Sequence, residues 1–303
     1  MSQEATAGVL VSLSSQLADV VERTAPSVVR VDDGSRLTAT GILWSAEGVI
    51  VATSHGVERD EELTVELADG MRLAATLVGR DPDIDLAVLR VNATGLPAIE
   101  RAGENEIRVG HLVLALGRPG TAGLQATIGV VGARIESQTH GQPGSILHTD
   151  AVLYPGFSGG PLVDVSGRMV GLNNLMFGRG RGVTIGTSIV AAVTEALLSH
   201  GRVPRGYLGV RTQRVALQEN LARALQLEQT RGLLVVGVES GSPAEKGGLL
   251  LGDTLLGINE RRVQDVEELR GSLREAKAGE AITLRILRGG QLQNLSVTLG
   301  AEP

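Results

Sequence analysis

The sequence predicts a mainly β protein in which a β-barrel or β-sandwich is followed by a smaller α+β domain. Three observations indicate this class. The chain has 303 residues, which suits two domains at roughly 100–200 residues each. It contains 41 Gly residues and only 2% aromatic residues, a composition typical of short strands joined by tight turns. Hydrophobic residues make up 42% and charged residues 20%, so the chain can bury a sizeable core.

An amphipathic helix is expected near the start of the chain, over residues 12–25. Leu13, Leu17 and Val20 recur at helical spacing, and Pro26 ends the pattern. After Pro26 the chain changes to short apolar runs separated by Gly and Asp, which are typical of strands.

Strands dominate the chain from residue 27 to residue 189. One hairpin is especially clear, because residues 63–67 and 73–77 alternate apolar and polar side chains on either side of a turn at Asp69-Gly70. A helix over residues 190–200 closes the region. The other runs expected to form strands are 27–31, 41–44, 49–53, 86–91, 111–116, 125–131, 169–172 and 183–189.

A linker over residues 201–206 is predicted to separate a first domain, residues 1–200, from a second domain, residues 207–303. Gly and Pro punctuate the linker. The charge differs across it, because 12 basic and 12 acidic residues follow residue 205 and the net charge of −6 belongs wholly to the earlier part. The second domain is expected to contain helices at 216–226 and 264–276, strands at 232–238 and 255–259, and a last hairpin around Gly289-Gly290. A further short helix is expected to open at Ser242-Pro243-Ala244 and to end at Gly247-Gly248.

Composition also excludes several classes of function. The negative net charge argues against nucleic-acid binding. Zero Cys excludes disulfides and thiolate metal sites. The five His residues do not occur at HxxxH spacing, so neither a metal nor another cofactor is expected. No apolar run is long enough for a membrane span. The Met-Ser-Gln-Glu start is unlike a secretion signal, so we expect a cytoplasmic protein, or an exported one whose leader was removed.

The segment Gly156–Leu162 is the strongest chemical motif. It places Ser158 between glycines, which let the backbone turn sharply and direct amide N–H groups to one point. A serine hydroxyl becomes a nucleophile when a base takes its proton and donors receive the negative charge that forms on the substrate. The same motif could instead be a plain Gly-rich turn.

Two further segments supply the partners that such a serine needs. His55 ends an apolar strand and could act as a general base. A carboxylate that hydrogen-bonds the far side of its ring would complete a triad, and Asp81, Asp83 and Asp85 all precede an apolar strand. The chain order of His, Asp and Ser is that of chymotrypsin-like proteases.

Taken together, these motifs resemble the protease domain of the HtrA (high-temperature-requirement) family. The resemblance is carried by Ala52–His55, Asp83–Leu89, Leu114–Gly120, Thr149–Ala151 and Pro155–Pro161. It implies two packed antiparallel β-barrels with the active site between them, as in trypsin, and a PDZ domain after the protease.

The resemblance also implies a role for individual residues. His55 would be the base, Asp85 the orienting acid and Ser158 the nucleophile. The backbone N–H groups of Gly156 and Ser158 would form the oxyanion hole. In this fold the segment before the serine lines the specificity pocket, so Val152 and Leu153 would favour small or medium apolar side chains.

Several polar residues near these motifs are expected to have structural roles instead. His111, His140, His148 and His200 lack a paired carboxylate motif, and Asp150 is expected to be a structural hydrogen-bonding residue. The Arg-containing segment 178–182 would lie in a solvated loop beside the specificity pocket.

A peptide-binding site is expected in the second domain, at the segment Leu208-Gly209-Val210. A loop of this kind can direct N–H groups toward a peptide carboxylate, and the following strand edge can accept an added strand. The helix 264–276 would form the opposite wall. Its candidate contacts are Val266, Leu269 and Leu273, which could equally be core residues.

The function implied is that of an ATP-independent serine endopeptidase that cleaves unfolded or damaged proteins and binds peptides with apolar free C-termini. The alternative is a latent or inactive chaperone or scaffold, because Phe157 stands where the family usually has Asn, and Gly56 where it usually has a bulkier apolar residue. The family commonly forms trimers through N-terminal aromatic residues. Residues 1–43 contain none, so a homo-oligomer built in that way is in question.

Overall fold

The structure is a computed structural model that describes residues 3–35, 38–139, 142–177, 182–203 and 206–301. The chain forms two compact units, one made of residues within 1–203 and the other containing residues 206–301. The segment 178–181, the Arg-containing part of the predicted solvated loop, lies outside the described residues, as does His140. Among the helices of the described residues, none is long and apolar enough to cross a membrane.

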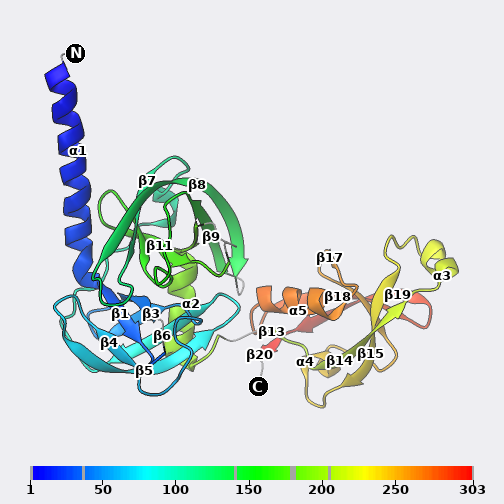
Figure 1. Cartoon of the computed structure of the whole chain (residues 1–303). Coiled ribbons are helices and arrows are strands. Elements are labelled where there is room, and N and C mark those ends of the chain that lie inside the picture. Colours follow the sequence, from blue (N-terminus) through cyan, green and yellow to red (C-terminus); the bar gives the residue numbers. More distant parts are fainter. Residues whose placement is uncertain (1–2, 36–37, 140–141, 178–181, 204–205, 302–303) are drawn as a thin grey trace. The chain divides into compact units, whose positions relative to one another are not determined.

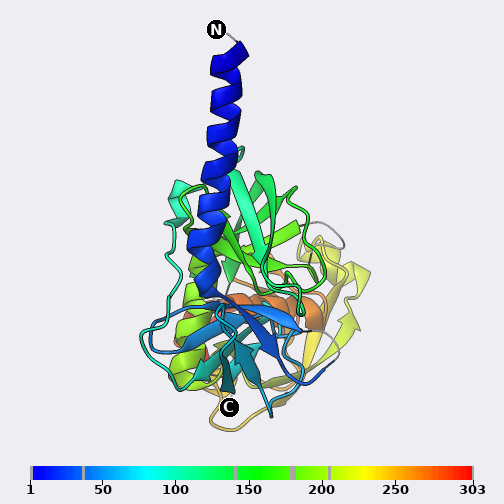
Figure 2. The ribbon, with the colours of Figure 1, turned by 60° about the vertical axis from the view of Figure 1, so that its left-hand side comes forward.

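Helix α1, Gln3–Thr24, is longer than the predicted helix 12–25 and begins nine residues earlier. The segment before Ser12 contains good helix formers and a single Gly, which weakens a helix without ending it. The helix ends in a 3₁₀ turn, Ala25–Ser27, that contains Pro26. Figures 1 and 2 both show the N-terminal turns of α1 extending beyond the barrels.

The first barrel is closed and has the strand order β1-β2-β3-β6-β5-β4. The predicted hairpin is confirmed, since β4 pairs with β5 across the turn at Asp69-Gly70. Alternating Val, Leu and Ile side chains fill its interior. The strands are β1 (Val28–Asp32), β2 (Ala39–Leu43), β3 (Val49–Ala52), β4 (Thr64–Glu66), β5 (Arg72–Asp81) and β6 (Leu86–Val91).

The second barrel is also closed, with the order β10-β11-β12-β9-β8-β7. A short 3₁₀ turn, Glu104–Glu106, lies in the segment that leads to it from the first barrel. The strands are β7 (Leu112–Gly117), β8 (Gln125–Thr139), β9 (Gln142–Thr149), β10 (Pro161–Asp164), β11 (Met169–Asn174) and β12 (Gly182–Gly186). The mainly β class predicted from the sequence is therefore confirmed, with barrels rather than a sandwich.

One apolar cluster joins the two barrels and helix α2 (Thr187–His200). It includes Ile42 and Leu86 from the first barrel, Leu116 and Leu172 from the second, and Val190 from the helix, all of them buried. The active site expected between the barrels therefore rests on a packed interface rather than on two independent domains.

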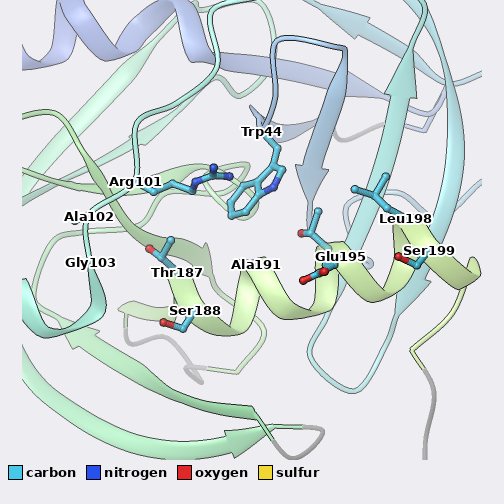
Figure 3. A pocket seen from close by; sticks show the side chains of 11 residues that line it. Trp44, Arg101, Ala102, Gly103, Thr187, Ser188, Ala191, Glu195, Leu198 and Ser199 are labelled. Atoms are coloured by element: carbon cyan, nitrogen blue, oxygen red, sulfur yellow. The ribbon is translucent and has the colours of Figure 1, made fainter.

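An open hollow of about 610 Å³ lies beside α2, where the helix meets the end of β2 and the segment between the barrels. Figure 3 shows Arg101 over the indole of Trp44, with Thr187, Ser188 and Glu195 from α2 on the other side. The guanidinium carbon is 4.3 Å from the indole centroid, a cation–π contact. None of the predicted catalytic residues lines this hollow.

The C-terminal unit is an α+β domain around its own core. Its sheet has the order β14-β15-β16-β18-β19, so β14 is an edge strand. Helix α5 packs against β13 and β14. The strands are β13 (Gly206–Tyr207), β14 (Val210–Ala216), β15 (Arg231–Val238), β16 (Thr254–Ile258), β17 (Arg261–Arg262), β18 (Ala281–Arg288), β19 (Gln291–Thr298) and β20 (Gly300–Ala301). The helices are α3 (Glu219–Ala224), α4 (Pro243–Lys246) and α5 (Val266–Glu275).

Candidate active site

His55 and Asp85 lie together at the ends of β3 and β6. The Nδ1 atom of His55 is 2.5 Å from Oδ2 of Asp85, and the backbone N–H of His55 donates to Oδ1 at 2.8 Å. The Asp85 side chain is buried, whereas 30% of the His55 side chain is exposed. A buried carboxylate that holds one face of a reachable imidazole is the arrangement that a general base requires. Asp81 instead accepts a hydrogen bond from the backbone N–H of Asp83.

Asn174 is a residue of this site that the sequence did not single out. Its Nδ2 donates to Oδ2 of Asp85 at 2.8 Å, and its Oδ1 accepts the backbone N–H groups of Met176 and Phe177 at 2.9 and 3.1 Å. The side chain is fully buried at the end of β11. Asp85 has a left-handed backbone with φ of 56°, so the network of hydrogen bonds fixes a carboxylate whose own backbone is unfavourable.

Asp33 supports the loop that follows His55. Its carboxylate is buried and accepts the backbone N–H groups of Ser35, Glu58 and Arg59 at 2.9, 2.8 and 3.3 Å. Burial alone would raise the pKa of Asp33, but the hydrogen bonds from Ser35, Glu58 and Arg59 together lower the pKa below its ordinary value.

Ser158 is buried in the turn before β10. Its Oγ accepts the backbone N–H of Leu175 at 3.1 Å, and within the described residues no hydrogen bond joins it to His55. Leu175 follows Asn174, so this one segment contacts both the acid and the nucleophile. Catalytic hydrogen bonds are often long or misaligned before substrate binds.

The expected oxyanion donors, the N–H groups of Gly156 and Ser158, donate to no protein acceptor in the part of the chain that the structure describes. The peptide bond between Gly156 and Phe157 is engaged elsewhere. The Gly156 carbonyl accepts the Thr40 hydroxyl at 2.5 Å, and the Phe157 N–H donates to the Tyr154 carbonyl at 2.9 Å. The carbonyl of this peptide therefore does not occupy the hole.

The side chain of Phe157 is fully buried in the second barrel. Its ring meets Tyr154 edge to face, with centroids 5.7 Å apart. It also covers Gly117 so closely that a Cβ there would lie 2.6 Å from the ring. Phe157 therefore anchors the turn that carries Ser158 to the barrel.

The expected specificity residues line an open cavity of about 700 Å³. Val152 is exposed, and Leu153 is partly buried against the second barrel. Ile135 and Leu175 add apolar walls. Asp150, which was expected to have a structural role, also lines this cavity. Its Oδ1 accepts the backbone N–H of Val130 at 2.6 Å.

Among the described residues, His111, His148 and His200 make no hydrogen bond to the His55–Asp85 pair. His148 lines the cavity beside Asp150. His200 contacts the Ala196 carbonyl through Nδ1 at 3.2 Å, and His111 accepts from Arg108 at 3.4 Å.

In the C-terminal unit, Gly209 lies in a turn with φ of 79°. A Cβ at this position would be 2.3 Å from the Cβ of Ser242, so only Gly fits. The carbonyls of Leu208 and Gly209 accept the N–H groups of Ala244 and Glu239. Their own N–H groups have no protein acceptor among the described residues. Val210 begins the edge strand β14.

The apolar residues of helix α5 differ in how deeply they are buried. Leu269 is buried in the core, whereas Val266 and Leu273 are partly buried and pack against that core, as Val210 does. The two partly buried residues could contact a ligand, and Leu269 is principally a core residue.

Each of the two units matches the model of a known domain family. A model of the trypsin-like peptidase domain matches residues 39–172, and a PDZ domain model matches residues 206–299. A probable periplasmic serine endoprotease, DegP-like, from Ectopseudomonas mendocina is 34% identical over 97% of this chain and 64% of the relative. One from Chlamydia trachomatis is 35% identical over 87% of this chain and 54% of the relative. The chain thus spans between 54% and 64% of these relatives' length.

Solved structures match almost from end to end. The HtrA-type protease AlgW with a decapeptide has a TM-score of 0.70 and 31% identity, and the match covers 95% of this chain and 99% of that one. A serine endoprotease from Yersinia pestis has a TM-score of 0.71 and 31% identity, over 95% and 98% of the two chains. With this fold, both matched domains and identity sustained along the chain, the protein belongs to the family of HtrA-type proteases.

Proposed function

We propose that this chain is an ATP-independent serine endopeptidase that cleaves unfolded or damaged polypeptides and uses its PDZ domain to bind peptide C-termini. The observation that carries the proposal is the contact of a buried Asp85 with a reachable His55, because the segment Asn174-Leu175 that contacts Asp85 also contacts Ser158. His55, Asp85 and Ser158 are the catalytic residues of this proposal.

In the reaction, substrate binding brings Ser158 Oγ against the scissile carbonyl. His55 Nε2 takes the hydroxyl proton, and Asp85 stabilises the imidazolium through Nδ1. The N–H groups of Gly156 and Ser158 receive the negative charge on the substrate oxygen, a contribution of about 3–4 kcal/mol per donor. His55 then protonates the leaving amine, and water releases the acyl group from Ser158 by the same steps in reverse.

The backbone around Phe157 supports the active enzyme over the latent scaffold. Thr40 and Tyr154 hold the peptide bond before Phe157, and both oxyanion donors point to no protein acceptor in the described residues. A collapsed hole would need one of these backbone groups to turn inward.

The test is casein cleavage by Ser158→Ala, His55→Ala and the double variant. Each single variant should lose activity by orders of magnitude, and the double variant should be little worse, because the residues act as a unit. Ser166→Ala, at an exposed position, and His111→Ala, at a half-buried one, are matched controls. Retention of more than about a tenth of the activity in Ser158→Ala, or a wild-type serine that a fluorophosphonate does not label, would favour the scaffold.

The cavity walls support cleavage after small or medium apolar residues such as Val, Ala and Leu. Val152 and Leu153 cannot pair a basic side chain, and the nearby Asp150 is engaged by the Val130 N–H. Mass spectrometry of casein fragments tests this directly, with Asp150→Asn as the comparison. If the wild type cuts mainly after Lys or Arg, and Asp150→Asn abolishes these cuts, the predicted apolar specificity is wrong.

For the PDZ domain, we infer that the free N–H groups of Leu208 and Gly209 bind the terminal carboxylate of a peptide with an apolar last residue. Val210, Val266 and Leu273 would contact that residue, with Leu269 behind them. We expect roughly micromolar affinity, about −8 kcal/mol. Amidation of the peptide should weaken binding about tenfold, because the N–H groups lose a charged acceptor. Equal affinity of the acid and the amide would refute this assignment.

Self-association is the proposed use of the exposed part of α1. Val9, Leu10 and Leu13 are exposed on the same side of the helix whose lower half buries Val20. We infer that copies of this chain cover these side chains and form a homo-oligomer, a trimer by the family resemblance, without aromatic anchors. Light scattering after size exclusion tests this, with Leu10→Asp against Ser15→Asp; a monomeric wild type would refute it.

An exported, periplasmic location is the inference that the named relatives support over the cytoplasmic alternative. Fractionation of the native cells measures it. Recovery of the protein with cytoplasmic markers would refute it.

A further inference from the structure

We propose that the peptide site of the C-terminal unit selects acidic side chains at two positions, the penultimate residue and the fifth residue from the C-terminus, through Arg211 and Arg214. The inference rests on the proposed PDZ function, because it uses the same bound peptide. It adds the chemical class of the preferred peptide.

The first step is the register of the added strand. β14 pairs with β15 on one side, and no other described strand pairs with its second edge. A carboxylate on the N–H groups of Leu208 and Gly209 lies at the start of β14, so the peptide must run antiparallel to it. The last peptide residue then lies opposite Val210, the penultimate residue opposite Arg211, and the fifth from the end opposite Arg214.

The bulge in this part of the sheet leaves that register intact. The pairing of β14 with β15 shifts between Arg211 and Thr212, where Arg211 faces Gly237 but Thr212 faces Val235. The extra residue, Val236, is therefore on β15, and the free edge of β14 continues without interruption.

The second step is the position of the two arginines. Both are exposed, whereas Val210 and Thr212 are half-buried. The Arg211 side chain lies over Gly237 of β15, where a Cβ would be 2.8 Å from its Nε, and a change of its side-chain rotamer would bring the guanidinium to the added strand. Side chains directly opposite on antiparallel strands have Cβ atoms about 5 Å apart, within reach of a peptide carboxylate.

The third step is the charge around the site. No acidic residue occurs between residues 206 and 218. The carboxylates of α5 are already engaged: Glu267 by Arg270 and Arg274, Glu268 by the Gln264 N–H, and Glu275 by Arg261. Across the loop, Glu239 accepts the Tyr207 hydroxyl and raises the pKa of that phenol.

By contrast, Arg211 and Arg214 have no ion pair or hydrogen bond among the described residues. Two cations without counter-ions on the edge strand leave a carboxylate of the added peptide as their partner. Opposite charges directly across strands contribute modestly, so each matched pair should tighten binding about threefold.

The experiment measures fluorescence polarisation of labelled peptides on the full chain carrying Ser158→Ala, which prevents cleavage. The parent peptide ends in a free valine carboxylate and has Gln at both test positions. Its variants carry Glu or Lys at one position at a time. The protein variants are Arg211→Gln, Arg214→Gln and the matched control Arg223→Gln, an exposed arginine on α3.

Glu at the penultimate position should bind about threefold more tightly than Gln, and Lys about threefold more weakly. Arg211→Gln should abolish this preference and leave the preference at the fifth position, and Arg214→Gln should do the reverse. Ionic strength of about 1 M should remove both, because screening then acts over about 3 Å. Arg223→Gln should change neither.

Three results would overturn the inference. Equal binding of Glu, Gln and Lys peptides by the wild type excludes charge selection while leaving carboxylate binding intact. Equal loss in Arg223→Gln shows a general charge effect. Failure of the parent peptide to bind, or its indifference to amidation, removes the proposed PDZ function and this inference together. Unchanged melting temperatures of the three variants establish that lost preference is not lost folding.

Discussion

Phe157 offers the sharpest test of how the nucleophile turn is held. Its fully buried ring packs on Gly117 and Tyr154 in the second barrel. Phe157→Ala should cost about 3–5 kcal/mol of unfolding free energy, the usual loss for a buried Phe. That is a large share of the roughly 5–15 kcal/mol that stabilises a typical protein.

Activity should respond far less than stability. The peptide bond before Phe157 is fixed by the Thr40 hydroxyl and the Tyr154 carbonyl, and these bonds do not involve the Phe157 side chain. Phe157→Asn should therefore change kcat/KM less than about tenfold, or 1.4 kcal/mol, at a temperature where the variant stays folded.

Urea denaturation and cleavage of a peptide substrate, measured in the same buffer, separate the two effects. Leu162→Ala is the matched control, because Leu162 is equally buried in the same cluster but lies on β10. It should lose about 2–5 kcal/mol of stability and keep its activity. A hundredfold gain in Phe157→Asn would show that Phe157 keeps the hole collapsed, since one donor is worth about 10²–10³ in rate.

Three further outcomes follow from the hydrogen bonds described above. Because the pKa of Asp33 is lowered in the folded protein, its contribution to the free energy of unfolding is present above its ordinary pKa of about 4 and is lost as pH falls. Asp33→Asn should therefore lower the free energy of unfolding by about 1–3 kcal/mol at neutral pH and by less in acid. Equal shifts of the urea midpoint at both pH values would contradict this. Asn174→Ala should lower kcat and change KM less, because it removes a hydrogen bond that holds Asp85, and Asn174→Ser should recover part of the lost kcat. An unchanged pH–rate profile would refute a positioning role for Asn174. Gly209→Ala should abolish peptide binding in polarisation assays while casein cleavage continues; normal binding would show that this turn tolerates a Cβ.

The sequence predicted the elements whose signals are local. The hairpin β4–β5 followed from alternation and an Asp-Gly turn, and the end of α1 followed from Pro26. The start of α1 was wrong because Ser12 and Ser14 resemble N-caps, and no local rule says that the helix continues through Gly8. Where a helix begins depends in part on contacts with residues distant in the sequence, and the spacing of apolar residues does not reveal those contacts.

The candidate site divides in the same way. His55 and Ser158 stand in motifs of their own, whereas Asp85 was singled out from Asp81 and Asp83 by the family resemblance. Asn174 carries no such signal: it reaches Asp85 only because β11 and β6 come together when the two barrels pack. Asp150 was expected only as a structural residue, yet it lines the same cavity as Val152, two residues later in the chain.

Thr40 has a consequence for what an activity measurement reports. Its hydroxyl, on a strand of the first barrel, donates to Gly156 and accepts the Arg118 N–H, both of which belong to the second half of the fold. A slight separation of the barrels would break this contact while each barrel kept its own hydrogen-bonded strands. Turnover should then stop at a lower temperature than the one at which circular dichroism changes. Loss of activity would therefore report separation of the two barrels before either barrel unfolds.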